Sequence, residues 1–237
     1  QFGMLAELYP DRIDLGLGRA PGTDQQTLGR ALRRDPRSAE NFPQDVLELQ
    51  AWLSNESPLP GVVAVPGFNT NVPLYILGSS MFGASLAAKL GLPYAFASHF
   101  APQQLEQATA YYRENYEPSE RYPEPYCIAA VNVIASDTEE DADRQQHTVH
   151  RERVRSMIGR RGAPLSEQQL DAHMHSIQGR QIIDMLRYTA KGTGENIQDY
   201  LTWFKSLAQA DELMISLQAA SHEEALRGME ILAAHRP

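Results

Sequence analysis

The sequence predicts an α/β fold built on parallel strands. Short apolar segments rich in Ile, Leu and Val alternate along the chain with longer segments of helical periodicity. That alternation is typical of strand–helix–strand units, whose strands pair in parallel. Residues 72–77 form an almost continuously apolar run, as expected of a strand that is buried on both faces of a parallel sheet.

The composition is that of an ordinary globular protein and excludes several classes. The 237 residues are 42% hydrophobic and 22% charged, which is enough for a substantial core. No run reaches the ~18 apolar residues that a membrane-spanning helix needs. A single cysteine, Cys127, excludes an internal disulfide framework and predicts a reducing, cytoplasmic setting. The net charge of −9 argues against binding to nucleic acids or to an anionic membrane.

Six segments have the features of strands, because they are short and apolar and most of them end at glycine, proline or a small polar residue. They are residues 12–18, 62–65, 72–77, 94–98, 126–135 and 211–217. A turn alone separates residues 62–65 from the next segment, which favours an antiparallel pairing there. Five strands are therefore expected to be parallel.

Between the strands, apolar residues recur at helical spacing. Phe2, Leu5 and Leu8 show this spacing at the start, as if the sequence began inside a helix. The other predicted helices are residues 23–32, 43–53, 81–90, 102–116, 137–158, 182–188, 195–207 and 221–234. Residues 159–180 are polar and support no assignment.

The candidate site residues follow three of the predicted strands, and they are small, hydroxylated or cationic. They are Arg19, Gly78, Ser79, Ser80, Gly83, Ser98 and His99. Ligands of parallel α/β folds bind at the carboxyl ends of the strands, so we expect the functional site there. The stretch from Gly78 to Gly83 opens a helix, and its backbone N–H groups, its hydroxyls and Arg19 suit a phosphate. The alternative is that Ser79 simply caps the helix.

Other motifs point away from catalysis or metal binding. The glycines at 16–22 depart from the dinucleotide fingerprint, because the third glycine comes one residue late. The histidines at 147, 150, 173 and 175 lack a carboxylate–histidine motif, which predicts surface histidines and no metal site. The arginines at 151, 153, 155, 160 and 161 predict a solvated helix face. Cys127 is expected to be buried, and His99 to line a pocket or to be structural.

Three separated blocks resemble the bacterial luciferase-like, flavin-dependent monooxygenases, and most of all the MsnO8-type branch. The blocks are YPDRIDLGLGRAPG at 9–22, LGSS at 77–80 with LGLPYAFASHFAP at 90–102, and ADELMI at 210–215. The resemblance implies a (β/α)8 TIM barrel over residues 1–237 as a single domain, with 12–18 as its fourth strand. The first three strand–helix units, and the active-site histidine that relatives carry there, are then absent from this sequence, so no catalytic residue is assigned. Five strands do not close an eight-stranded barrel.

The resemblance also implies an activity and a set of cofactor contacts. Reduced FMN from a separate flavin reductase, together with O2, would oxygenate a small organic substrate. Arg19, Ser79 and Ser80 would hold the FMN phosphate with the amide of Gly83, where many relatives have a hydroxyl residue. Ser98 and His99 would line the flavin pocket, and a homodimer is expected. The alternatives are hydride transfer with the deazaflavin F420, a flavin-binding protein without turnover, and a truncated fragment.

Overall fold

The structure is a computed structural model that describes residues 1–20, 39–159 and 164–235. The chain divides into two compact units. Unit 1 comprises Gln1–Ala95 and Tyr111–Tyr126, and unit 2 comprises Phe96–Ala110 and Cys127–Pro237. The single domain expected over residues 1–237 stays a prediction.

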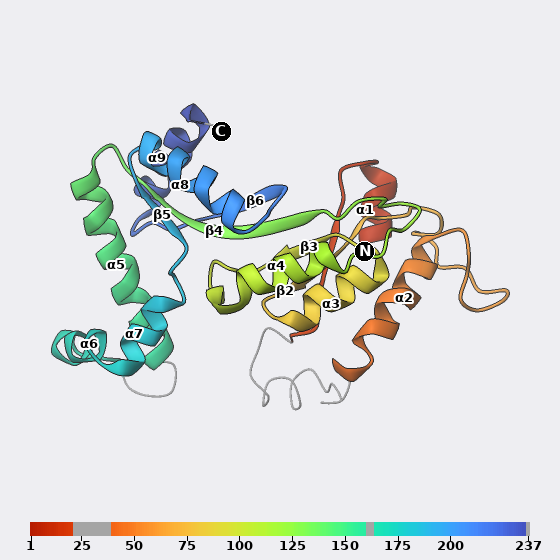
Figure 1. The fold of residues 1–237 in the computed structure, drawn as a ribbon, viewed down its shortest axis with the longest axis horizontal. Coiled ribbons are helices and arrows are strands. Elements are labelled where there is room, and N and C mark those ends of the chain that lie inside the picture. The colour runs from red at the N-terminus through yellow and green to blue at the C-terminus, as the bar shows by residue number, and fades with distance from the viewer. Residues whose placement is uncertain (21–38, 160–163, 236–237) are drawn as a thin grey trace. The chain divides into compact units, whose positions relative to one another are not determined.

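Unit 1 is built around two parallel strands and the helix that follows the second strand and packs on it (Figure 1). Its elements are α1 (Phe2–Leu8), β1 (Leu15–Gly18), α2 (Phe42–Leu53), β2 (Leu74–Gly78), α3 (Met81–Leu90) and the start of β3 (Tyr94–Phe96). β1 pairs with β2 in a register that places Leu15 opposite Leu74 and Gly18 opposite Leu77. The carboxyl ends of the two strands therefore lie at the same edge.

Small side chains let α3 lie close to β2. Ala84, Ala87 and Ala88 are buried against the sheet, and Ile76 of β2 is fully buried. The helix ends at Gly91, whose φ of 58° lies in the left-handed region that glycine adopts without strain. This packing fixes where the amino end of α3 begins, directly after β2.

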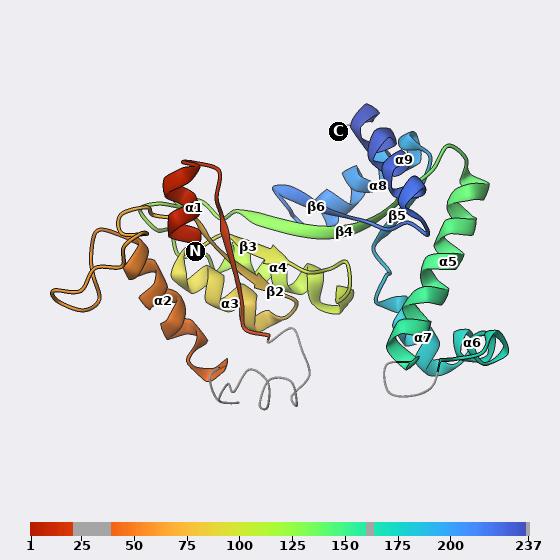
Figure 2. The same cartoon turned by 180° about the vertical axis from the view of Figure 1, so that it is seen from behind.

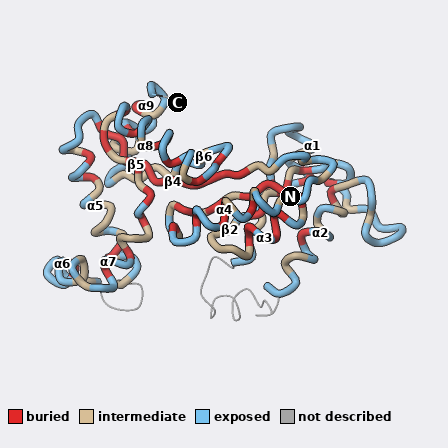
Figure 3. The backbone as a smooth tube through the Cα atoms, in the orientation of Figure 1, coloured by how far each residue is buried: buried red, intermediate tan, exposed pale blue. Residues whose placement is uncertain are grey.

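Unit 2 is centred on β4 (Cys127–Ala135), which is buried at each of its residues (Figure 3). Its other elements are η3 (Pro102–Gln104), α4 (Leu105–Glu114, which extends into unit 1), α5 (Glu139–Ile158), α6 (Glu167–Met174), α7 (Ile177–Asp184), β5 (Thr189–Gly192), α8 (Gly194–Leu207), β6 (Glu212–Leu217) and α9 (His222–Ala234). Both β5 and β6 pair with β4 in parallel. The uninterrupted burial of β4 follows from these pairings and from the helices α5, α8 and α9 that pack on it.

Helices α5, α6 and α7 form a helical cluster within unit 2, side by side in both views (Figure 1 and Figure 2). Val154, Leu170 and Ile182 make its small buried core, one residue from each helix. Ser166 and Gln169 form a capping box that starts α6, and Ser176 caps α7. These helices occupy most of the polar segment that supported no assignment from sequence.

Most of the expected elements are present, and three expectations need correction. Residues 62–65 form no strand; Val62, Val63 and Val65 are exposed there. The helix expected at 182–188 is α7, which begins and ends earlier, at Ile177 and Asp184. The strand β5 was missed because Thr189-Ala190-Lys191-Gly192 has little strand propensity, and its pairing with β4 decides its conformation. The helix expected at 23–32 lies outside the described residues.

The α/β class with parallel strands is confirmed. Of the strands in the described ranges, β1 and β2 pair in parallel within unit 1, and β5 and β6 each pair in parallel with β4 within unit 2. The closed eight-stranded barrel stays an expectation from the resemblance. None of the helices in this part of the chain is long and apolar enough to cross a membrane.

Candidate functional site

The first group of candidate residues meets at the carboxyl edge of β1 and β2. Gly18 and Leu77 are register partners, so Arg19 and Gly78, the next residues, both lie at this edge. Ser79 and Ser80 follow Gly78 and lead directly into α3. The arrangement expected from the positions of the strand ends is therefore present within unit 1.

Arg19 is placed beside the first turn of α3 by an aromatic contact. Its guanidinium lies over the ring of Phe82, 3.8 Å from the ring centroid. Phe82 is the second residue of α3, so the cationic group lies next to the amino end of that helix. A guanidinium that lies over a ring face can still donate its N–H groups to an anion.

The amino end of α3 lacks a side-chain cap. The N-cap residue is Ser80, and it makes no capping hydrogen bond through its side chain. Ser79 is therefore not the cap, and the capping alternative is wrong. The first turn of α3 carries no acidic residue, so no carboxylate of that turn offsets the positive end of the helix dipole. The amino end of α3 thus has the backbone polarity that an anion requires.

Tyr94 packs against this turn and holds it in place. The sequence analysis did not identify Tyr94 as part of the site. Its hydroxyl donates a hydrogen bond to the carbonyl oxygen of Ser80 over 3.3 Å, and its ring is fully buried. A Cβ at Gly78 would lie 3.4 Å from Tyr94 Cε2, and one at Gly83 would lie 3.2 Å from it. Glycine at 83 thus lets the first turn of α3 rest on the Tyr94 ring. The sequence signal that could have identified Tyr94 was an aromatic residue at the start of a buried strand, shortly after a glycine-containing turn.

The second group of candidate residues belongs to unit 2. Ser98 is fully buried, and its hydroxyl donates to the carbonyl oxygen of Ala130 over 2.5 Å. The carbonyl oxygen of His99 accepts a hydrogen bond from Asn132 Nδ2 over 2.7 Å. Both bonds tie this strand end to β4. Among the described residues, however, the buried Nδ1 atom of the His99 ring has no hydrogen-bond partner.

Acid is expected to destabilise unit 2 through His99. Burial, and to a smaller degree the charge of Arg153, holds the pKa of His99 below its ordinary value of 6.5. The unfolded chain therefore binds a proton more readily than the folded one, and the free energy of unfolding falls as the pH drops below about 6.5. Burial lowers the pKa of His150 in the same direction.

The measurement is denaturant unfolding at a series of pH values. In the His99→Gln variant, we expect the free energy of unfolding to fall less steeply as the pH drops below 6.5. The contribution of His150 to this fall is expected to remain. An unchanged slope in that variant contradicts the assignment of this titration to His99.

The remaining motifs lie outside the two groups of candidate residues. No group of metal-ligating side chains occurs in the described ranges, which include all four histidines considered above. Cys127 is free and buried. Arg151 and Arg155 form ion pairs on the exposed face of α5, with carboxylates of Glu152, Glu167 and Asp171. Arginines 160 and 161 lie outside the described residues.

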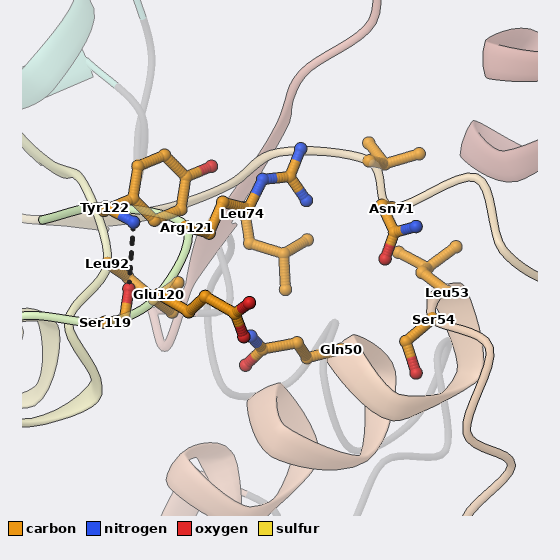
Figure 4. Close-up of a pocket in the computed structure, with 11 residues that line it drawn as sticks. Gln50, Leu53, Ser54, Asn71, Leu74, Leu92, Ser119, Glu120, Arg121 and Tyr122 are labelled. Carbon is orange, nitrogen blue, oxygen red and sulfur yellow. Dashed lines mark hydrogen bonds between the residues drawn. The ribbon is translucent and has the colours of Figure 1, made fainter.

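A separate pocket of about 420 Å³ opens at the other end of the strands (Figure 4). Leu74, the first residue of β2, and Leu92, which precedes β3, form part of its apolar lining. Figure 4 shows the Arg121 guanidinium near Leu74 and the Glu120 carboxylate near Gln50. Because these residues lie at the amino ends of the strands, the pocket is distinct from the edge that carries Arg19, Ser79 and Ser80.

Comparisons with known proteins agree on one family. The family model described as luciferase-like monooxygenase matches residues 1–199. A protein named luciferase-like monooxygenase from Escherichia coli (strain K12) is 39% identical over 232 residues, covering 98% of this chain and 69% of the relative. The crystal structure of apo-MsnO8 has a TM-score of 0.81 and 30% identity, covering 99% of this chain and 71% of that one.

Two solved structures share the fold at lower identity. The oxygenating constituent of 3,6-diketocamphane monooxygenase of Pseudomonas putida, in complex with FMN, has a TM-score of 0.64 at 12% identity, over 99% of this chain and 72% of that one. An F420-dependent secondary alcohol dehydrogenase has a TM-score of 0.65 at 14% identity, over 100% of this chain and 73% of that one.

Proposed function

Because this chain belongs to the luciferase-like monooxygenase family, we propose that it binds reduced FMN and uses O2 to oxygenate a small organic substrate. The observation that carries the proposal is the amino end of α3, which has no side-chain cap and has the Arg19 guanidinium placed beside it over Phe82. A guanidinium, two serine hydroxyls and helix N–H groups are the donors that a phosphate dianion requires. The residues present therefore fit the cofactor.

Each residue of the edge then has a defined part in binding. Arg19 contributes the charged fork, and the hydroxyls of Ser79 and Ser80 donate hydrogen bonds to phosphate oxygens. Gly78 and Gly83 carry no side chain, which lets this turn lie against the Tyr94 ring, and the amide of Gly83 is proposed to donate to the phosphate. Tyr94 fixes the Ser80 carbonyl and so holds the turn in place.

The cofactor supplies the oxygen chemistry when bound, and the protein binds, orients and excludes water. Ser98 and His99 are proposed to line the flavin pocket, with the Ser98 hydroxyl fixing the strand end through its bond to Ala130. No residue of this sequence is assigned as the catalytic group. A separate flavin reductase is proposed as the source of reduced FMN, and a homodimer as the assembly.

F420 is the second candidate cofactor, because an F420-dependent dehydrogenase shares this fold. F420 also carries a phosphate, so the edge at α3 does not separate the two cofactors. The two proposals differ in what happens to O2, which an F420-dependent hydride transfer does not consume.

The test compares FMN, riboflavin and F420 as ligands, followed by O2 uptake. We expect FMN to bind more tightly than riboflavin, and reduced FMN to support O2 uptake that rises when an organic substrate is added. If the protein binds F420, reduces it only when substrate is present and takes up no O2, the monooxygenase proposal is rejected and an F420-dependent dehydrogenase is supported. If the protein binds FMN but turns over no substrate, the result supports a flavin-binding protein that has no catalytic activity.

A further inference from the structure

The pocket of about 420 Å³ lies within unit 1 and contains none of the candidate residues for flavin binding. It opens at the amino end of β2, whereas Ser79 and Ser80 follow the carboxyl end of that strand. Four aliphatic side chains of its lining are more than nine-tenths buried, namely Leu53, Val72, Leu74 and Leu92. Small-molecule sites have volumes of this order and a largely apolar lining, so the pocket suits a small ligand with an aliphatic group.

Hydrogen bonds fix the two walls of this pocket. On one wall, the N–H of Asn71 donates to the carbonyl oxygen of Leu53 over 2.8 Å, which ties the loop before β2 to the end of α2. On the other wall, the Ser119 hydroxyl donates to the carbonyl oxygen of Gly91 over 2.9 Å and accepts from the N–H of Tyr122 over 3.1 Å (Figure 4). The pocket is therefore preformed, and a ligand that enters it has little of the chain to order.

Two opposite charges line the pocket, and neither forms an ion pair or a hydrogen bond within the part of the chain that the structure describes. They are the Glu120 carboxylate and the Arg121 guanidinium. Figure 4 shows the guanidinium on the side of Leu74 and the carboxylate on the side of Gln50, so the two charges lie apart. A ligand that satisfies both needs an anionic and a cationic group.

A third polar group of the same wall also lacks a partner. The hydroxyl of Tyr122 is buried and makes no hydrogen bond within the described ranges. Figure 4 shows this hydroxyl on the side of the Arg121 guanidinium, whose central carbon lies 5.6 Å from the centroid of the Tyr122 ring. A buried hydroxyl without a partner is costly, and an oxyanion bound beside the guanidinium would supply one.

We propose that this pocket binds a zwitterionic α-amino acid with an aliphatic side chain. Its carboxylate accepts hydrogen bonds from the Arg121 guanidinium and the Tyr122 hydroxyl. Its ammonium group donates to the Glu120 carboxylate and to the amide oxygen of Gln50. Its side chain packs on Leu74 and the rest of the apolar lining. The inference does not rest on the proposed function, because the pocket shares no residue with the flavin site.

The test compares three probes that share one aliphatic chain: L-leucine, 4-methylpentanoate, which lacks the ammonium group, and 3-methylbutan-1-amine, which lacks the carboxylate. Isothermal titration calorimetry on the full chain without flavin gives the three affinities. We expect L-leucine to bind about fivefold more tightly than either analogue, the upper end of what one exposed ion pair contributes. Equal affinity for the three probes, or no binding of any of them, overturns the inference.

Substitutions of the two charged residues assign each charge of the ligand to its partner. Arg121→Gln is expected to weaken binding of L-leucine and of 4-methylpentanoate by about fivefold and to leave binding of the amine unchanged. Glu120→Gln is expected to weaken binding of L-leucine and of the amine to the same degree and to leave binding of 4-methylpentanoate unweakened. Both residues are exposed, so these variants are expected to fold as the unaltered chain does.

Lys89→Gln and Glu124→Gln are the matched controls, because each removes one charge from an exposed residue of unit 1 that does not line the pocket. Both are expected to bind L-leucine as the unaltered chain does, and losses equal to those in Arg121→Gln and Glu120→Gln contradict the proposed contacts. Nuclear magnetic resonance adds a local readout: L-leucine is expected to shift the methyl resonances of Leu74. Binding that leaves these resonances in place rejects this pocket as the site.

Discussion

Arg19→Ala is expected to weaken FMN binding by ~10–100-fold, the largest effect on cofactor binding that we predict. A hydrogen bond to a charged group contributes about 1.5–3 kcal/mol, which corresponds to that change in Kd. The guanidinium is preplaced over Phe82 beside the amino end of α3, so the bound state loses little side-chain freedom. The measurement is quenching of FMN fluorescence on titration with protein.

Two controls make this result specific to the phosphate. Arg12 is an exposed arginine that precedes β1 and so lies at the other end of the same strand, and Arg12→Ala is expected to leave the Kd for FMN unchanged. Riboflavin lacks the phosphate, so Arg19→Ala is expected to have no effect on its binding. An equal loss of FMN and riboflavin affinity in Arg19→Ala argues against a phosphate contact at Arg19.

Gly91→Ala is expected to destabilise unit 1 by about 2–5 kcal/mol, the largest effect on stability that we predict. The φ of Gly91 is 58°, and an L-residue there costs about 1–2 kcal/mol. In addition, a Cβ would lie 2.6 Å from the carbonyl oxygen of Glu117 and 2.8 Å from Ser119 Cβ, so the backbone must shift, at a cost of typically about 1–3 kcal/mol. The midpoint of thermal unfolding, Tm, is expected to fall by about 10 °C for a chain of this size.

Gly61→Ala separates the two contributions. Gly61 also has a positive φ, 81°, but a Cβ there meets no atom within 4 Å. This variant therefore carries the backbone strain without the steric overlap and is expected to cost about 1–2 kcal/mol. Equal effects at the two positions contradict the steric argument. Gly91 lies at the far end of α3 from Ser80, so the folded part of Gly91→Ala is expected to bind FMN as the unaltered chain does.

Elements with strong local signals were predicted correctly. The continuous apolar run at 72–77 and the Ile- and Val-rich run at 126–135 are β2 and β4, and Gly91 ends α3 as expected. The failures have a common cause. Residues 62–65 look like a strand but remain unpaired, while Thr189–Gly192 has weak propensity and becomes β5 because β4 lies beside it. Strand pairing involves residues far apart in the chain, which local pattern does not encode.

For the candidate site, the sequence by itself determined the residue types and the strand ends that carry them. The order strand, Gly78-Ser79-Ser80, helix follows from local pattern, and so does the position of Arg19 after the neighbouring strand. The tertiary structure decided which of these groups are available. It placed Arg19 on Phe82, set Tyr94 beneath Ser80 and used the Ser98 hydroxyl in a bond to Ala130.

The same division holds for the arginines of α5. Their sequence pattern predicts one solvated face, but the position of α6 gives carboxylate partners to Arg151 and Arg155 and leaves Arg153 without one among the described residues. Charge and spacing are local properties that a sequence displays directly. Whether a charge is neutralised depends on distances of a few ångströms between elements that the chain brings together, because Coulomb energies and hydrogen bonds fall off steeply with separation.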